Sequence, residues 1–155
     1  MDVIKRFLLL WILSMAILHA SAYDFEVDGI YYNILPEGMS VEVTAGDDPY
    51  NEYGDQPNII IPQEVEYKGE KYTVTGIGAT AFYTGKTFSI NFESIDLPVT
   101  IKKFGGSAFA NACFKKVYIH DLTSWCNIIN DGGSSSTCLY DSNNPDNVCV
   151  LYLNG

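Results

Sequence analysis

The chain has 155 residues, 47% of them hydrophobic and 18% charged, with a formal net charge of −10 at pH 7. A chain of this length can bury one substantial core, so we expect a single folded domain. Nucleic acids and anionic membrane surfaces repel such an acidic protein, and we exclude both as expected partners.

The first 22 residues have the three parts of a secretory signal peptide. Lys5-Arg6 is a short positive region, residues 7–18 are almost all apolar, and residues 20–22 form an Ala-Ser-Ala cleavage site. The apolar run is too short to span a bilayer, which takes about 20 residues. We therefore expect an exported protein that begins at Tyr23 and has no membrane span once the signal is removed.

Residues 23–73 alternate between short apolar segments and turns, which predicts an N-terminal β cap. The turns Asp28-Gly29 and Lys68-Gly69 each separate two strand-like segments and predict antiparallel hairpins. The cap strands are expected at Phe25–Val27, Ile30–Ile34, Met39–Val43, Glu64–Tyr67 and Glu70–Val74.

Residues 44–58 are polar and contain two glycines and two prolines, which predicts a loop. The acidic part of this loop, residues 47–55, offers the carboxylate and amide oxygens that calcium prefers. Its spacing does not match an EF-hand, so a solvated loop is the favoured interpretation and a calcium site the alternative. Tyr50 and Tyr53 lie in this loop and are candidates for exposed contact residues.

Two kinds of repeat indicate a solenoid over residues 74–155. Gly78–Phe82 (GATAF) returns as Gly105–Phe109 (GGSAF), and Gly78 and Gly105 are expected to supply a tight bend. The L-x-x-L-x-L pattern of a leucine-rich repeat occurs at Phe92–Leu97 and at Phe114–Ile119. Shorter copies lie at 59–61 and 151–153. Each unit should add one strand to a parallel sheet and one layer to a continuous core.

This spacing assigns side chains to the two faces of the sheet. The outward positions, which form a candidate binding face, are Glu93, Asp96, Lys116 and Tyr118. The core positions are Ile77, Phe82, Ile95, Leu97, Phe104, Phe109, Val117 and Ile119.

A polar insertion is expected at residues 121–148, and three of the four cysteines lie in or beside it. Four cysteines allow three pairings, and the sequence does not choose between them. Because an exported protein meets an oxidising compartment, we expect one disulfide among Cys126, Cys138 and Cys149.

No catalytic pattern is present. His120-Asp121 contains the only histidine after the signal peptide, and no G-x-S-x-G, H-E-x-x-H or P-loop accompanies it. We expect a polar residue at the exit of a strand, and we expect no enzyme activity, cofactor or bound metal.

Several segments resemble the BspA-like leucine-rich-repeat family of bacterial surface proteins. Val74–Phe82, Ser94–Pro98, Val117–Ile128 and Leu151–Gly155 are similar to its repeats, and Phe25–Tyr72 resembles the cap that precedes them. The resemblance implies a mainly β fold, a short solenoid with parallel strands on one face and an antiparallel β-hairpin cap.

The chain departs from this family in two ways. The family's unit often continues Ala-Phe-x-x-Cys, where this chain has Gly85 and Ala112. The repeats are also fewer than usual.

The resemblance implies a secreted or cell-surface, non-enzymatic interaction or adhesion module that binds proteins or surface glycans. The alternative is a truncated remnant, or an assembly subunit with no ligand of its own, that self-associates through its C-terminal edge strand.

Overall fold

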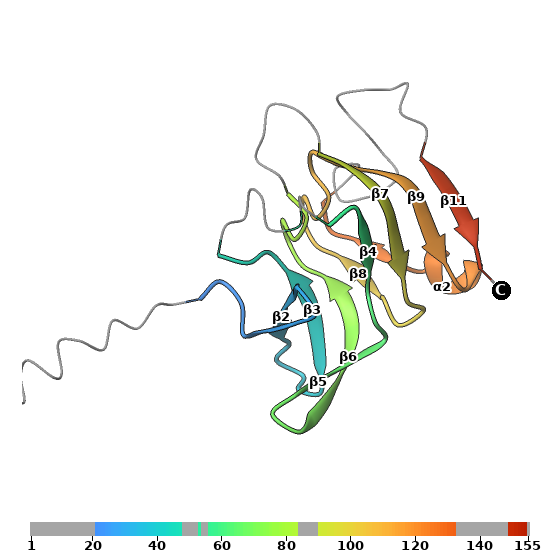
Figure 1. Ribbon diagram of the computed structural model, residues 1–155. Helices are drawn as coiled ribbons and strands as arrows, with labels where there is room; N and C mark the ends of the chain where they lie inside the picture. The colour runs from blue at the N-terminus through green and yellow to red at the C-terminus, as the bar shows by residue number, and fades with distance from the viewer. Residues whose placement is uncertain (1–20, 48–52, 54–55, 84–89, 133–148, 155) are drawn as a thin grey trace, which may run out of the picture.

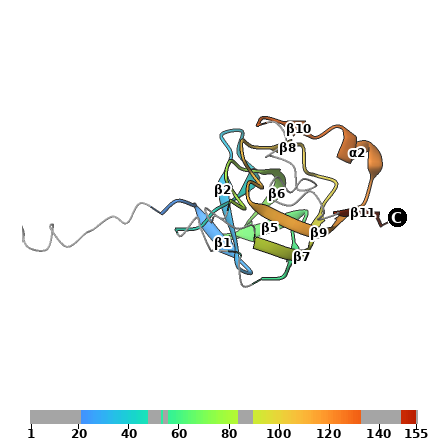
Figure 2. The same cartoon turned by 90° about the horizontal axis from the view of Figure 1, so that it is seen from above.

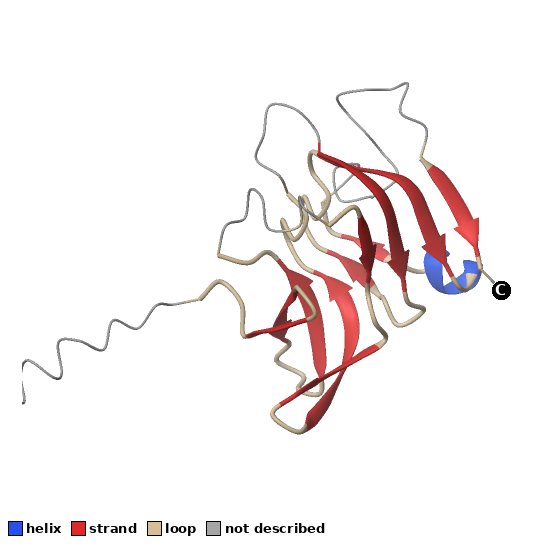
Figure 3. Cartoon of the chain, viewed as in Figure 1, coloured by secondary structure: helices blue, strands red, loops and turns tan. Residues whose placement is uncertain are grey.

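The structure, a computed structural model, describes residues 21–47, 53, 56–83, 90–132 and 149–154. Most of the predicted signal peptide, most of the acidic loop, and Cys138 lie outside the described residues. The strands form two sheets, which we call the cap sheet and the repeat sheet (Figures 1 and 3).

The cap begins with an antiparallel meander, as the sequence predicts. β1 pairs with β2, β2 pairs with β3, and β5 pairs with β6. The two hairpin turns have both central residues at positive φ, 51° and 77° at Asp28-Gly29 and 53° and 82° at Lys68-Gly69, a geometry that suits the twist of the flanking strands. The bounds are β1 Phe25–Val27, β2 Ile30–Ile34, β3 Ser40–Thr44, β5 Glu64–Tyr67 and β6 Glu70–Ile77.

The repeat sheet consists of four parallel strands in the order β11-β9-β7-β4. Each strand contains one of the L-x-x-L-x-L segments or one of their shorter copies. Neighbouring units therefore add strands side by side, as in a leucine-rich-repeat solenoid. The bounds are β4 Asn58–Ile60, β7 Ile90–Leu97, β9 Ala112–Ile119 and β11 Val150–Leu153.

A second set of parallel strands, absent from the sequence prediction, closes the other side of the solenoid. β8 (Lys103–Phe104) pairs with β6, and β10 (Ile129–Asn130) pairs with β8. Because β6 also pairs with β3, these strands belong to the cap sheet, and β6 runs through the expected boundary at residues 73 and 74. Figure 2 shows β8 and β10 on one side of the molecule and β7 and β9 on the other.

The described part of the insertion contains regular structure. A short helix, α2 (Leu122–Cys126), follows β9, and β10 follows α2. Asp121 caps α2, because its carboxylate accepts a hydrogen bond of 2.6 Å from the Ser124 N–H.

The core lies between the two sheets and is rich in stacked aromatic rings. The Phe82 and Phe109 rings stack at 5.4 Å, the Phe92 and Phe114 rings stack at 4.7 Å, and Phe114 meets Phe82 edge-on. The eight side chains that the spacing assigns to the core are all at most 3% exposed: Ile77, Phe82, Ile95, Leu97, Phe104, Phe109, Val117 and Ile119.

The two copies of the glycine motif stack directly on each other. Phe82 N–H donates to the Ala108 carbonyl at 2.8 Å, and Gly105 N–H donates to the Ile77 carbonyl at 2.8 Å. A Cβ at Gly105 would lie 2.4 Å from the Ala79 nitrogen, so glycine is needed here for close backbone approach. The left-handed residues of the bend are Thr80 and Ser107, which corrects the assignment of the bend to the glycines.

Candidate functional site

The outer face of the repeat sheet carries all four side chains of the candidate binding face. Glu93 and Lys116 are exposed, and Asp96 and Tyr118 are half-buried. Parallel pairing of β7 with β9 places Asp96 directly beside Tyr118. Because Phe92, Ile95 and Leu97 turn inward, the residues between them turn outward, and the register aligns them across the sheet.

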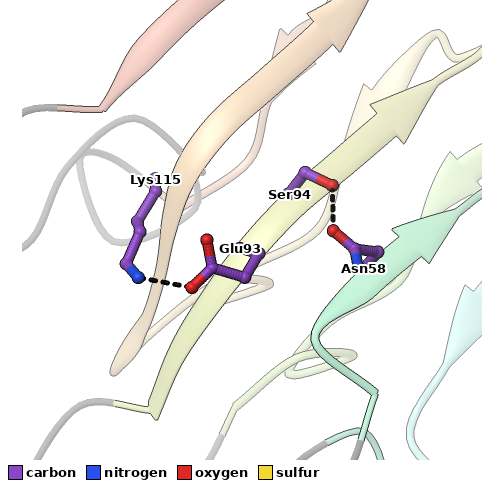
Figure 4. A network of polar contacts seen from close by, with 4 residues as sticks. All are labelled: Asn58, Glu93, Ser94 and Lys115. Carbon is purple, nitrogen blue, oxygen red and sulfur yellow. Dashed lines mark hydrogen bonds and ion pairs between the residues drawn. The ribbon is translucent and has the colours of Figure 1, made fainter.

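Polar contacts tie three strands of this face together (Figure 4). Lys115 of β9 forms an ion pair with Glu93 of β7, and the Ser94 hydroxyl donates to the Asn58 side-chain oxygen of β4 at 2.8 Å. The hydrogen bond from Lys115, with its positive charge, lowers the pKa of the Glu93 carboxyl. These exposed pairs fix side-chain positions more than they stabilise the fold.

A second row of contacts lies nearer the carboxyl ends of the strands. His120 Nε2 lies 2.7 Å from Asp96 Oδ1, and the Tyr118 ring packs against the Tyr152 ring of β11 at 5.1 Å. Asp121 caps α2 instead of pairing with His120. This hydrogen bonding at the helix start lowers the pKa of the Asp121 carboxyl. His120 and Asp121 therefore have separate partners.

Tyr53 is not an exposed contact residue, which corrects the sequence expectation. It is 4% exposed and packs against Phe82 with 4.8 Å between ring centroids. Its hydroxyl donates to the Thr44 carbonyl at 2.7 Å and accepts from the Tyr31 N–H at 3.2 Å. Through this ring contact and these hydrogen bonds, Tyr53 packs against the cap instead of facing solvent. Tyr50 lies outside the described residues.

Of the three cysteines expected to form a bridge, Cys126 and Cys149 are free thiols in the structure, and Cys138 lies outside the described residues. Cys126 is exposed on α2, whereas Cys149 packs against the core just before β11. Burial, with a smaller contribution from Cys113, raises the pKa of the Cys149 thiol to about 11. A raised pKa lowers the thiolate fraction and slows disulfide exchange. Whether a bridge forms after export stays a prediction.

Within the described residues, no group of three or more histidine, cysteine, aspartate and glutamate side chains is arranged to hold a metal ion. A search of the same residues finds no helix long and apolar enough to cross a membrane.

No model of a known protein family matches the chain, and no curated protein matches it. Solved structures of bacterial leucine-rich-repeat proteins are similar to it. A leucine-rich cell-surface protein from Faecalibacterium prausnitzii is 23% identical with a TM-score of 0.49, and the match covers 63% of this chain. This chain spans 23% of that protein's length.

Two further structures are of leucine-rich-repeat proteins from Bacteroides species. The one from Bacteroides capillosus is 18% identical with a TM-score of 0.46, and the match covers 84% of this chain and 98% of that one. The one from Bacteroides ovatus is 24% identical with a TM-score of 0.34, and the match covers 76% and 39%. The assignment of a leucine-rich-repeat solenoid rests on the parallel strands and register of this chain itself.

Sequence analysis placed His120 at the exit of a strand but missed its contact with Asp96, and it missed four polar residues of the outer face altogether: Asn58, Ser94, Lys115 and Tyr152. Their equivalent positions in successive repeat units are the sequence feature that locates them. Ser94 and Lys116 occupy the same place in successive units, as do Asp96 and Tyr118, so aligning the units also places Asn58 and Tyr152 in these two rows.

Proposed function

We propose that the protein is an exported, BspA-like, non-enzymatic interaction module that binds proteins or surface glycans through the outer face of the repeat sheet. One observation carries the proposal. Outward side chains on β7, on β9 and just after β9 form polar pairs, Glu93 with Lys115 and Asp96 with His120, beside the packed, tilted rings of Tyr118 and Tyr152. A rigid face that combines charged and aromatic side chains suits contact with another macromolecule.

The export part of this proposal rests on the signal peptide predicted at residues 1–22. Secretion of the full-length chain by a bacterial host, with a mature N-terminus at Tyr23, supports it. Retention of the uncleaved chain inside the cell contradicts it. N-terminal sequencing of the secreted protein is the measurement.

The binding part is tested by retention of the mature chain on immobilised extracellular-matrix proteins and bacterial surface polysaccharides. The double variant Glu93→Lys and Asp96→Lys should lose retention, because it reverses two charges of the face. The control variant Glu64→Lys and Glu70→Lys makes the same charge change on exposed cap positions and should be retained as well as the wild type. Failure of the wild type to bind any panel member argues against the proposal.

An assembly role is the second candidate, and the exposed apolar side chains of β11 favour it. Val150, Leu151, Tyr152 and Leu153 are all exposed at one edge of the repeat sheet. Such an edge can pair with another copy of the chain. Under this hypothesis the mature protein self-associates with rising concentration, and Leu151→Lys abolishes the association. A monomer at every concentration in analytical ultracentrifugation rules this candidate out.

A further inference from the structure

The repeat sheet has a second edge, at β4, where it meets the cap. β4 pairs with β7 on one side, and the sheet order ends at β4 on the other. The cap sheet continues past this point through β6 and β3, whereas the repeat sheet does not. The part of the chain that the structure describes therefore leaves one long side of β4 without a partner strand.

The hydrogen bonds to β7 show which backbone groups of β4 face this open side. The Pro57 carbonyl accepts from β7, and the Ile61 N–H donates to the Asp96 carbonyl at 3.0 Å. Residues alternate in a parallel ladder, so Pro57, Ile59 and Ile61 direct their backbone groups to β7. The N–H and C=O of Asn58 and Ile60 then point away from β7. They are the groups that an added strand would bind.

A groove lies along this side of β4, with the β1–β2 hairpin as its opposite wall. Its volume is about 340 Å³, within the range of sites that hold small ligands and short peptide segments. Asn58, Ile60 and Pro62 line one wall, and the hairpin residues line the other. The hairpin contributes Val27, Asp28, Ile30 and Tyr32.

Tyr32, on the hairpin wall of this groove, carries a second observation that bears on ligand binding. Tyr32 is fully buried, yet its hydroxyl has no hydrogen-bond partner among the residues that the structure describes. An unsatisfied buried hydroxyl is costly, and such exceptions in folded proteins call for an explanation. Because Tyr32 lines the groove, a rotation of its side chain that brings the hydroxyl to the groove would let a ligand group supply the bond.

The negative charge beside the groove favours a ligand that carries a cationic side chain. Among the described lining residues Asp28 alone is charged, and the whole chain has a net charge of −10. The Gln56 side-chain amide donates to the Gly29 carbonyl at 3.2 Å and so leaves its oxygen as an acceptor. The groove thus offers acceptors for a cationic side chain, and the N–H and C=O groups of two β4 residues for an added strand.

We propose that this groove binds an extended peptide segment of another protein, which adds a strand to β4 and places a lysine or arginine beside Asp28. The strand is short, with Pro57 before it and Pro62 after it, so the segment that pairs with it has about three or four residues. This site adjoins the outer face of the repeat sheet, because Asn58 belongs to both, but the peptide test below does not depend on a ligand of that face.

The test uses the mature chain and a library of blocked hexapeptides that contain one lysine among valine, isoleucine, threonine and alanine. Fluorescence polarisation should find binders, and replacement of their lysine by glutamate should abolish binding. N-methylation of the peptide at alternate amides should weaken the best binder about tenfold in one register and leave it unchanged in the other, because only one set of amides faces β4.

Variants of the protein separate a backbone contact from a side-chain contact. Ile60→Pro removes both the outward N–H and the isoleucine side chain and should weaken peptide binding about tenfold, whereas Ile60→Ala removes the side chain but keeps the N–H and should bind nearly as well as the wild type. Asp28→Asn keeps a residue that tolerates positive φ and should weaken binding of lysine peptides selectively. Thermal melts confirm that each variant is folded.

Three results would overturn the proposal. One is the absence of any binder in the library. Another is equal affinity of the two N-methylation registers, which shows that no strand is added. The third is equal affinity of a lysine peptide and its glutamate counterpart, which shows that the groove does not select a cationic side chain.

Discussion

The two ends of the solenoid differ in how their apolar side chains are covered. At the N-terminal end, Phe25 stacks on Tyr67 at 4.3 Å and lies near Tyr32 and Tyr72, so the cap buries the first layer under aromatic rings. At the C-terminal end, the side chains of β11 lie open. The same repeat pattern is therefore buried or exposed according to its neighbours.

Leu97 and Leu153 show this most directly, because they occupy the same position in two units. Both align with Ile119 in the register, yet Leu97 is 2% exposed and Leu153 is 59% exposed. Burial in a stacked fold is a property of the layer above and below a residue. The predictions that follow probe this contrast.

The largest effect is expected from alanine at these two equivalent positions. Leu97→Ala should lower the free energy of unfolding by about 3 kcal/mol, because it opens a cavity between packed layers. Leu153→Ala should lower it by less than about 1 kcal/mol. Urea denaturation of both variants measures the difference. Equal losses would show that the C-terminal strand is as tightly packed as the centre.

A second contrast concerns two adjacent glycines. Gly105→Ala should lower the free energy of unfolding by about 2 kcal/mol, because the new methyl group meets the backbone of Gly78 and Ala79. Gly106→Ala should have almost no effect, since no atom lies within 4 Å of the position its Cβ would take. Urea denaturation distinguishes the two. A stable Gly105→Ala variant would mean that the two copies of the motif do not stack closely.

Two buried tyrosines of the cap should respond in opposite directions to phenylalanine. Tyr53→Phe removes the bond to the Thr44 carbonyl and should lower the free energy of unfolding by about 1 kcal/mol. Tyr32→Phe removes a hydroxyl that has no partner in the described residues and should raise it by up to about 1 kcal/mol. If Tyr32→Phe destabilises the free protein, the Tyr32 hydroxyl already has a hydrogen-bond partner. The hydroxyl then no longer supports the proposal that the groove binds a peptide.

The smallest effect concerns Glu42, which lies where the cap joins the repeats. Burial is the main cause of the raised pKa of its carboxyl; Glu37 adds to the rise and Lys103 opposes it. A raised pKa means that the fold favours the protonated form. This contribution is present below the ordinary pKa of 4.5 and is lost as pH rises through the folded-state pKa.

Glu42→Gln should therefore raise the melting temperature relative to the wild type at about pH 7, and the gain should shrink toward about pH 3. Glu64→Gln, at an exposed cap position, is the control and should show no such trend. A gain that is constant with pH would mean that the carboxyl charge is not the cause.

The spacing of apolar residues within each repeat was sufficient to predict its strand and which side chains face the core. Phe92, Ile95 and Leu97 follow a pattern that places them on one side of a strand, and the hairpin turns at Asp28-Gly29 and Lys68-Gly69 carry their own signals. Such patterns within short segments predict the hairpins of the cap, the parallel strands of the repeat sheet and the side chains on its outer face.

The remaining features depend on contacts between distant segments. β8 and β10 have two residues each, and each depends on a distant neighbour: β8 pairs with β6, and β10 pairs with β8. Tyr53 looks like a loop residue until its ring meets Phe82 and its hydroxyl meets the cap. The groove at β4 arises because one sheet continues into the cap and the other stops, which no local pattern records.

The most direct test of the proposed function is hydroxyl-radical footprinting of the mature chain with a partner from the retention panel. The account predicts that oxidation of Tyr118 and Tyr152, on the outer face of the repeat sheet, falls on binding. Tyr67 and Tyr72 of the cap should be oxidised as in the free protein. Unchanged oxidation of Tyr118 and Tyr152, together with protection of the cap tyrosines, would contradict the assignment of this face as the binding surface.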